Sequence, residues 1–75
     1  MPKLYSSKQI IKALGVRGFV FVSQKGSHIK LRRKLKNTVF TVIIPANRKE
    51  IPHGTFRSIL RQSHLEEEDF NHSSS

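Results

Sequence analysis

Three extended segments follow one another in the middle of the chain, with only two to five residues between them. Residues 19–22 and 38–44 are β-branched or aromatic, and the segment from His28 alternates polar with apolar side chains. Turn-forming residues lie between the segments, at 25–27 and 36–37. Because a parallel connection needs a dozen or more residues, strands joined in this way pair antiparallel. The sequence therefore predicts a three-stranded antiparallel meander.

A helix is expected before the meander, at residues 7–17. Ser6 and Gln9 have the spacing of a capping box, in which each side chain accepts a hydrogen bond from the other's backbone. Apolar residues then recur at helical spacing. Gly18 ends the segment, since glycine is the usual residue just past a helix C-terminus.

A second helix is expected after the meander. It starts near Pro52, which suits a first helical turn, or at Gly54. Phe56, Ile59 and Leu60 form the stripe that this helix would bury. The order α-β-β-β-α indicates an α+β fold with both helices covering one face of the sheet. The other face, or an edge, is left for a ligand.

The C-terminal end is expected to be short and acidic. Ser63 and Glu66 repeat the capping-box spacing, which predicts an acidic turn leading to Phe70. Residues 71–75 are expected to form a disordered tail. A chain of 75 residues without cysteine then holds one domain, residues 1–70, with no disulfide framework.

Positive charge is concentrated in the first part of the chain. The net charge is +9, made up of +13 over residues 1–61 and −4 over the remainder. Such a surface attracts polyanions, which favours a nucleic acid over the alternatives of an acidic protein partner or simple solubility. No apolar run is long enough for a membrane span and no signal-peptide pattern is present, so a cytoplasmic protein is expected.

The most informative motif is Gly-Ser-His at residues 26–28. Glycine allows a tight turn, and His28 then begins a strand on the same face as Lys30 and Arg32. An imidazole can take the proton of a ribose 2′-hydroxyl or give one to a leaving 5′-oxygen, while cations stabilise the phosphate. The alternative, more frequent for a lone histidine, is a surface residue or a phosphate contact.

Candidate RNA-binding residues fall into three basic groups. They are Lys25, Gly26, Ser27, Lys30 and Arg32 around His28; Arg48 and Lys49 in the loop at 46–50; and Arg57 and Arg61 on the second helix. The other histidines, His53, His64 and His72, are expected to be surface or capping residues. No spacing of histidines and acids predicts a metal site, and no cofactor is expected.

Several segments in order resemble a known family. They are residues 8–14, 18–20, 24–28, the apolar strand ending in Pro45, and Gly-Thr-Phe-Arg-Ser-Ile-Leu-Arg-Gln at 54–62. Together they are similar to the HicA (YcfA-like) toxin family over about residues 5–70. The resemblance implies a double-stranded-RNA-binding-like fold, metal-independent cleavage of mRNA, a HicB antitoxin that covers the site, and a catalytic role for His28.

Two features depart from that family. Asn47 stands where a histidine is often found, so His28 is the only catalytic imidazole expected. Residues 32–37 are unusually rich in lysine and arginine. The alternatives to a ribonuclease toxin are a non-catalytic module that binds double-stranded RNA or the antitoxin, and a domain that contacts only proteins.

Overall fold

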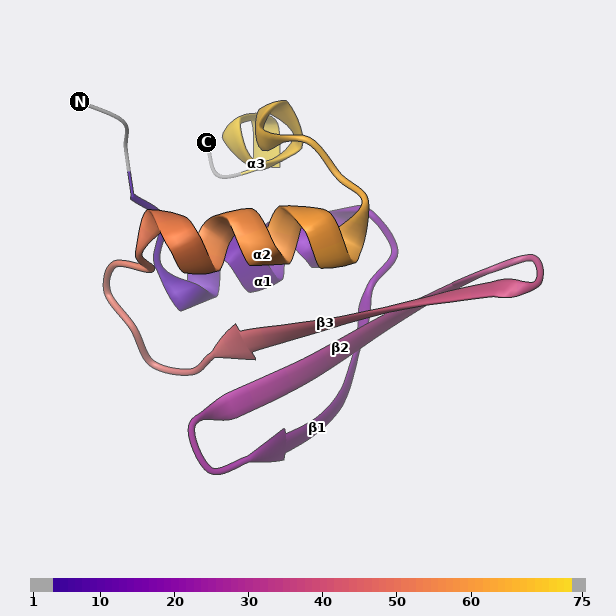
Figure 1. Cartoon of the computed structure of the whole chain (residues 1–75), viewed down its shortest axis with the longest axis horizontal. Coiled ribbons are helices and arrows are strands. Elements are labelled where there is room, and N and C mark those ends of the chain that lie inside the picture. Colours follow the sequence, from indigo (N-terminus) through magenta and orange to yellow (C-terminus); the bar gives the residue numbers. More distant parts are fainter. Residues whose placement is uncertain (1–3, 74–75) are drawn as a thin grey trace.

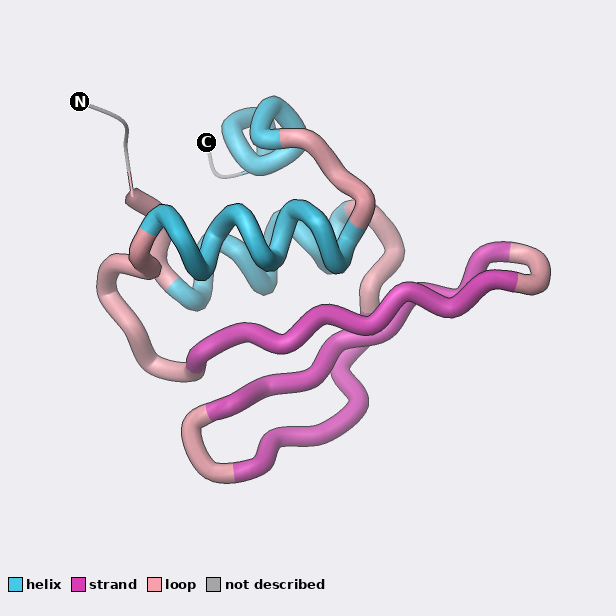
Figure 2. Tube along the Cα trace, in the orientation of Figure 1, coloured by secondary structure: helices cyan, strands magenta, loops and turns pink. Residues whose placement is uncertain are grey.

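A computed structural model describes residues 4–73 and shows the predicted α-β-β-β-α order followed by one further short helix (Figures 1 and 2). The elements are α1 (Ser7–Val16), β1 (Val20–Lys25), β2 (His28–Leu35), β3 (Thr38–Pro45), α2 (His53–Ser63) and α3 (Glu67–Ser73). The fold is α+β, consistent with the double-stranded-RNA-binding-like class expected from the sequence.

Local chemistry sets the bounds of α1. Ser6 and Gln9 form the predicted capping box, with the Gln9 backbone N–H donating to Ser6 Oγ at 3.1 Å and the Ser6 N–H donating to Gln9 Oε1 at 2.9 Å. The helix ends one residue earlier than predicted, because Arg17 is its C-cap. Gly18 follows with a φ of +100°, a conformation that other residues rarely adopt.

The three strands form an antiparallel sheet in the order β1-β2-β3. The β2–β3 pairing is continuous from His28 opposite Pro45 to Leu35 opposite Thr38. The β1–β2 pairing changes register between Phe21 and Ser23, so that one extra residue of β1 bulges out of the ladder. After this bulge β1 continues to Lys25, beyond the end predicted at residue 22, because pairing with β2 resumes.

Helices α1 and α2 both lie over one face of the sheet, as predicted, and the opposite face is open (Figure 1). One continuous core joins them to β2, β3 and α3. Its buried members are Tyr5, Ile10, Ala13, Leu14, Phe19, Leu31, Val42, Ile44, Ile51, Phe56, Ile59 and Phe70. In Figure 2, α3 packs on the two longer helices on the side away from the sheet.

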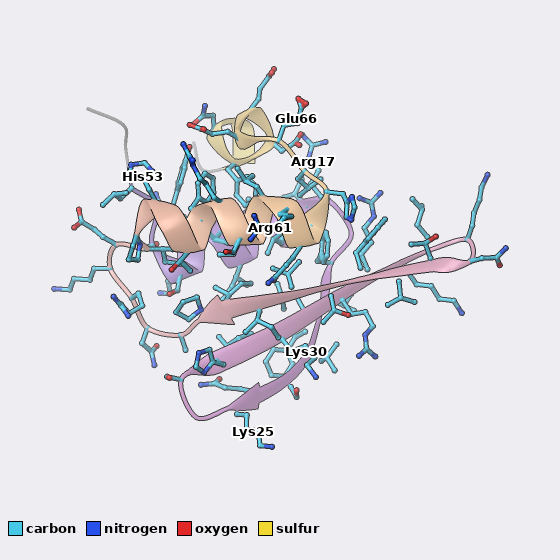
Figure 3. The ribbon with its side chains drawn as sticks, viewed as in Figure 1. Arg17, Lys25, Lys30, His53, Arg61 and Glu66 are labelled. Carbon is cyan, nitrogen blue, oxygen red and sulfur yellow. The ribbon has the colours of Figure 1, made fainter. Side chains whose placement is uncertain are left out.

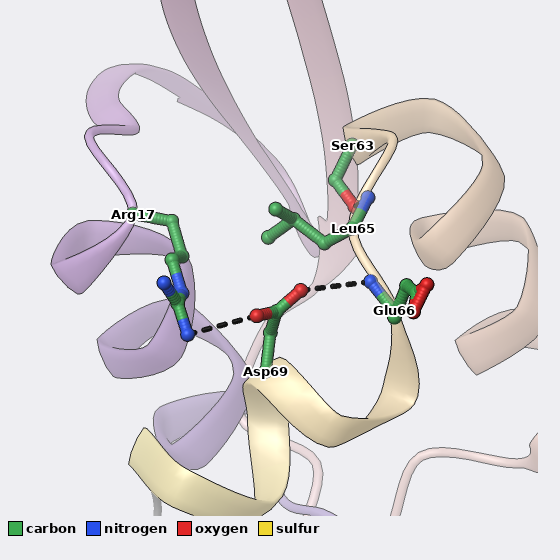
Figure 4. Close-up of polar contacts among 5 residues, drawn as sticks. All are labelled: Arg17, Ser63, Leu65, Glu66 and Asp69. Carbon is green, nitrogen blue, oxygen red and sulfur yellow. Dashed lines mark hydrogen bonds and ion pairs between the residues drawn. The ribbon is translucent and has the colours of Figure 1, made fainter.

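The predicted capping box at Ser63 and Glu66 is wrong. Ser63 is the buried last residue of α2, where its Oγ donates to the Leu60 carbonyl at 3.2 Å and accepts from the Leu65 N–H at 3.3 Å. The hydrogen bond at the start of α3 is instead between the Glu66 N–H and Asp69 Oδ2, at 2.9 Å (Figure 4). The pair Glu66 and Asp69 has the same three-residue spacing as the predicted pair Ser63 and Glu66. Ser63 cannot cap α3, because it is buried at the end of α2.

The expected tail, residues 71–75, overlaps the last helix of the structure. Asn71–Ser73 continue α3, and only residues 74 and 75 of the expected tail lie outside the described residues. Phe70 is buried in the core, and the Tyr5 hydroxyl donates a hydrogen bond to Asn71 Oδ1. These contacts join the two ends of the chain, so no local sequence pattern could predict them.

Candidate functional site

A pocket of about 420 Å³ opens on the face of the sheet that the helices leave uncovered. It is lined by Ser23, Lys25, His28, Lys30 and Ile43, and will be called the His28 pocket. All three strands contribute to it. The lining holds two lysines and one imidazole and no acidic side chain, so its potential favours an anion.

Strand register explains why these side chains meet. His28 pairs with Lys25 on β1, and Lys30 pairs with Ser23 on β1 and with Ile43 on β3. Directly opposite residues in an antiparallel pair share a face and have Cβ atoms about 5 Å apart. The bulge in β1 is essential, because without the extra residue Ser23 and Lys25 would point to the helix side.

The turn before β2 places His28 at the rim of the pocket. Gly26 has a φ of +59°, the left-handed region in which glycine is favoured. Its carbonyl accepts from Gln24 Nε2 at 3.2 Å, and the Ser27 carbonyl accepts from the Ala46 N–H at 2.7 Å. The turn is thereby tied to the end of β3. His28 itself is exposed, so a ligand on the open face can reach its ring.

Arg32 lies on the same open face as His28 but outside the pocket. It pairs with Val20 and Thr41, one row of the sheet beyond Lys30. In Figure 3, Lys25 and Lys30 extend from the strands, whereas Arg61 extends from α2. A chain of phosphates running along β2 from His28 would meet Lys30 first and Arg32 next.

Arg48 and Lys49 line a different cavity, of about 350 Å³, between the start of α1 and the loop after β3. This cavity will be called the α1 groove. Lys8 is a third cation at its rim. Its remaining lining residues are Ser6, Ser7, Ile11, Ile29 and Asn47. Because His28 and Ile29 are neighbours in β2, the His28 pocket and the α1 groove lie on opposite faces of one end of the sheet.

Buried Ser7 holds the loop of the α1 groove in place. Its Oγ donates to the Pro45 carbonyl at 2.5 Å and accepts from the Arg48 N–H at 2.9 Å, while its own N–H donates to the Arg48 carbonyl at 2.9 Å. Between them, Asn47 has a φ of +57°. The backbone that carries Arg48 is therefore fixed against α1.

The third basic group lies on α2, away from both cavities. Arg57 lines a third pocket, of about 620 Å³, with His53 near the start of that helix, and Arg61 Nη2 donates to Ser58 Oγ at 3.3 Å. His64 is the α2 C-cap, and its ring contacts Phe40 with 4.5 Å between the ring centroids. The predicted RNA-binding residues are thus divided among three surfaces rather than brought together in one site.

Sequence patterns did not predict Ser23 and Ile43 in the His28 pocket, or Lys8 in the α1 groove. Ser23 lay beyond the predicted end of its strand, and only the bulge brings it into the His28 pocket. Alternation along the strand puts Ile43 on the face opposite Val42 and Ile44. That Ile43 lies beside Lys30 could be known only from the register of the β2–β3 pair. The sequence indicated only that Lys8 is an exposed residue of the first helix. In the structure the loop after β3 lies beside it, so that Lys8 lines the α1 groove.

Within residues 4–73, no group of three histidine, aspartate or glutamate side chains could hold a metal ion. Over the same residues, no helix combines the length and the apolar character needed to cross a membrane.

Comparison with protein families identifies a relationship for most of the chain. Residues 7–65 match the family model described as the HicA toxin of bacterial toxin-antitoxin. The matched range covers α1, the whole sheet and α2, including the turn at 26–28, and ends before α3. No curated protein matches the chain.

Proposed function

The chain belongs to the HicA toxin family of bacterial toxin–antitoxin systems, and we propose that it is an endoribonuclease that cleaves mRNA without a metal ion, using His28 as its one catalytic imidazole. The observation that carries this proposal is the position of His28. Its exposed ring lies at an anion-attracting pocket beside Lys25 and Lys30. Its mRNA substrate would place the activity in the cytoplasm.

The proposed reaction is an intramolecular transfer at phosphorus. The ribose 2′-oxygen attacks the adjacent phosphorus, the bond to the 5′-oxygen breaks, and the products carry a 2′,3′-cyclic phosphate and a 5′-hydroxyl. The 2′-hydroxyl loses one proton and the 5′-oxygen gains one. His28 performs one of these two transfers and water the other, and either transfer suits an imidazole near neutral pH.

Lys25 and Lys30 would stabilise the charge that develops on the phosphate oxygens. Arg32 and the backbone of Gly26 and Ser27 would hold the neighbouring nucleotides, because they flank the His28 pocket along β2 and the turn. Arg48 and Lys49 on the α1 groove, and Arg57 and Arg61 on α2, would attract RNA by charge from other directions. A HicB-like antitoxin is the protein partner implied by the family.

The test is cleavage of RNA in EDTA by the wild-type protein, by His28→Ala and by His53→Ala. General acid–base catalysis contributes about 10²–10⁴-fold, so His28→Ala is expected to lose activity on that scale. His53 is an exposed histidine on α2 and serves as the matched control, with activity near wild type. End-group analysis should detect the cyclic phosphate.

Equal cleavage by the wild-type protein and His28→Ala would refute the proposal. RNA binding by the wild-type protein without cleavage would favour the alternative, a non-catalytic module that binds RNA or the antitoxin. Loss of activity on addition of EDTA would contradict metal independence. The role of His28 would then be tested by comparing the wild-type protein with His28→Ala in the presence of added metal.

A further inference from the structure

An exposed aromatic ring ends a cross-strand row that is otherwise buried. Phe21, Leu31 and Val42 lie opposite one another on the helix side of the three strands. Leu31 and Val42 are 2% and 0% exposed, whereas Phe21 is 62% exposed. The reason is visible in Figure 1, where β1 is the strand farthest from the helices. Burial of the Phe21 ring would complete the row.

The α1 groove lies next to this ring. Ile29 is two residues before Leu31, the partner of Phe21, and lies on the same face of β2, with the β1 bulge between the two rows. Ile29 and Ile11 are partly buried against the core and form the apolar floor of the groove. Lys8 and Lys49 stand with Arg48 at its rim, and no acidic side chain lines it.

This combination fits a protein segment better than RNA. An aliphatic floor and a bare phenylalanine gain free energy by removing apolar surface from water, and a sugar–phosphate backbone offers little apolar surface. The three cations then complement carboxylates at the edge of such a segment. A second copy of this chain is the wrong partner, because two surfaces with net charge +9 repel each other.

We propose that Phe21 and the α1 groove form an anchor for the antitoxin, through a segment that carries apolar side chains flanked by aspartate or glutamate. The anchor lies on the face of the sheet opposite the His28 pocket. The inference rests on the toxin–antitoxin part of the proposed function and is independent of RNA cleavage. An antitoxin that also covers His28 would wrap around the end of the sheet at the turn between β1 and β2.

The experiment measures binding of the purified antitoxin encoded beside this chain, by calorimetry at fixed salt. One variant is Phe21→Ser, which removes the ring, and the other is the pair Lys8→Glu with Lys49→Glu, which reverses charge at the rim. Glutamate at position 8 suits the first turn of α1, so the charge variant should fold. Val39→Ser is the matched control, because Val39 is exposed and lies on the open face.

Each anchor variant is expected to weaken antitoxin binding by about tenfold or more, as truncation of interface anchors does, while Val39→Ser stays within about twofold. Cleavage of RNA by Phe21→Ser should remain at the wild-type level. Circular dichroism and thermal unfolding establish that each variant is folded. If Phe21→Ser does not fold, the charge variant decides.

Wild-type antitoxin affinity in the folded anchor variants would overturn the proposal. Equal weakening by Val39→Ser would also overturn it, since the effect would not be specific to the anchor. If the anchor variants lose affinity for RNA but keep their affinity for the antitoxin, the groove binds RNA instead. Inactivity of the wild-type toxin on RNA would refute only the ribonuclease, because the binding measurement does not depend on cleavage.

Discussion

Ser7 is a small polar residue whose side chain is 4% exposed and joins two parts of the chain. Both hydrogen bonds of its hydroxyl, to the Pro45 carbonyl and from the Arg48 N–H, connect α1 to the loop after β3. Sequence patterns indicated only that position 7 begins a helix. The loop partners could not be predicted, because they lie about forty residues away and meet Ser7 only after the sheet has formed.

Ser7→Ala is expected to lower the free energy of unfolding by about 1–3 kcal/mol, since two partly buried backbone groups lose their partner. Urea unfolding measures the change. Ser58→Ala is the matched control, because the Ser58 hydroxyl bonds at 3.3 Å to the Gly54 carbonyl in an exposed position, and its loss should stay within about 0.5 kcal/mol. Equal effects of the two substitutions would show that Ser7 does not hold the loop.

Tyr5 gives the protein a pH dependence in alkaline solution. Burial, and secondarily the Glu67 carboxylate, raise the pKa of the Tyr5 hydroxyl above its ordinary value. A group whose pKa is higher in the folded state stabilises the fold fully below its unfolded pKa, near 10, and loses that contribution as the pH rises through the folded value. The neutral hydroxyl also donates to Asn71.

Tyr5→Phe is therefore expected to be less stable than the wild type at pH 7, by about 1 kcal/mol for one hydrogen bond. The difference in the free energy of unfolding should shrink above about pH 10. At that pH the Tyr5 hydroxyl ionises more readily in the unfolded chain than in the folded one, which destabilises only the wild type. Urea unfolding from pH 7 to 11 measures it. A difference that stays constant over this range would contradict the argument.

At the scale of elements, α3 is the part that the sequence described least well. An acidic turn ending at Phe70 was predicted, but a helix with buried and long-range contacts was not. Phe70 packs at 5.1 Å from the Phe56 ring and 6.3 Å from the Tyr5 ring, and Asp69 pairs with Arg17 at 2.8 Å (Figure 4). Seven residues cannot form a stable helix alone, so α3 depends on this packing.

Removing the ring of Phe70 is accordingly expected to matter far more than removing the ion pair. Phe70→Ala should lower the free energy of unfolding by about 3–5 kcal/mol, the usual effect of deleting a buried phenylalanine. Arg17→Ala should lower it by about 1 kcal/mol or less, because the pair is partly exposed. Thermal and urea unfolding test both, and comparable losses would contradict this account of α3.

For the whole molecule, the distribution of charge determines how RNA would be attracted. The net charge of +13 over residues 1–61 covers both faces of the sheet and α2, and four of the five acidic residues lie beyond residue 61. Affinity for RNA should therefore fall steeply with salt as counterions are released. Contacts at the His28 pocket contribute to the slope of log affinity against log salt concentration only if phosphates of the RNA lie there.

Substituting Lys25→Gln with Lys30→Gln is expected to reduce the slope of log affinity against log salt by about 0.7 for each cation removed. Lys36→Gln is the control, since Lys36 lies in the turn between β2 and β3, at the far end of the sheet from His28. Filter binding at several salt concentrations measures the slopes. An unchanged slope in the double variant would place the bound phosphates elsewhere.

The sequence by itself determined the order of elements from α1 to α2, the capping box of α1, the two tight turns and the family. Each of these depends on residues close together in the chain, whose periodicity and turn chemistry act locally. It also placed His28, Lys30 and Arg32 on one face, because side chains alternate along a strand. Only the tertiary structure decided which residues meet across strands and at the core.

The bulge in β1 brings Ser23 and Lys25 beside Lys30 and His28, and a ladder without it would send them to the other face. Packing of the loop after β3 on Ser7 moves Arg48 to the α1 groove, away from His28. Both outcomes depend on register and on contacts between distant residues, whose free energy exists only once the core has formed.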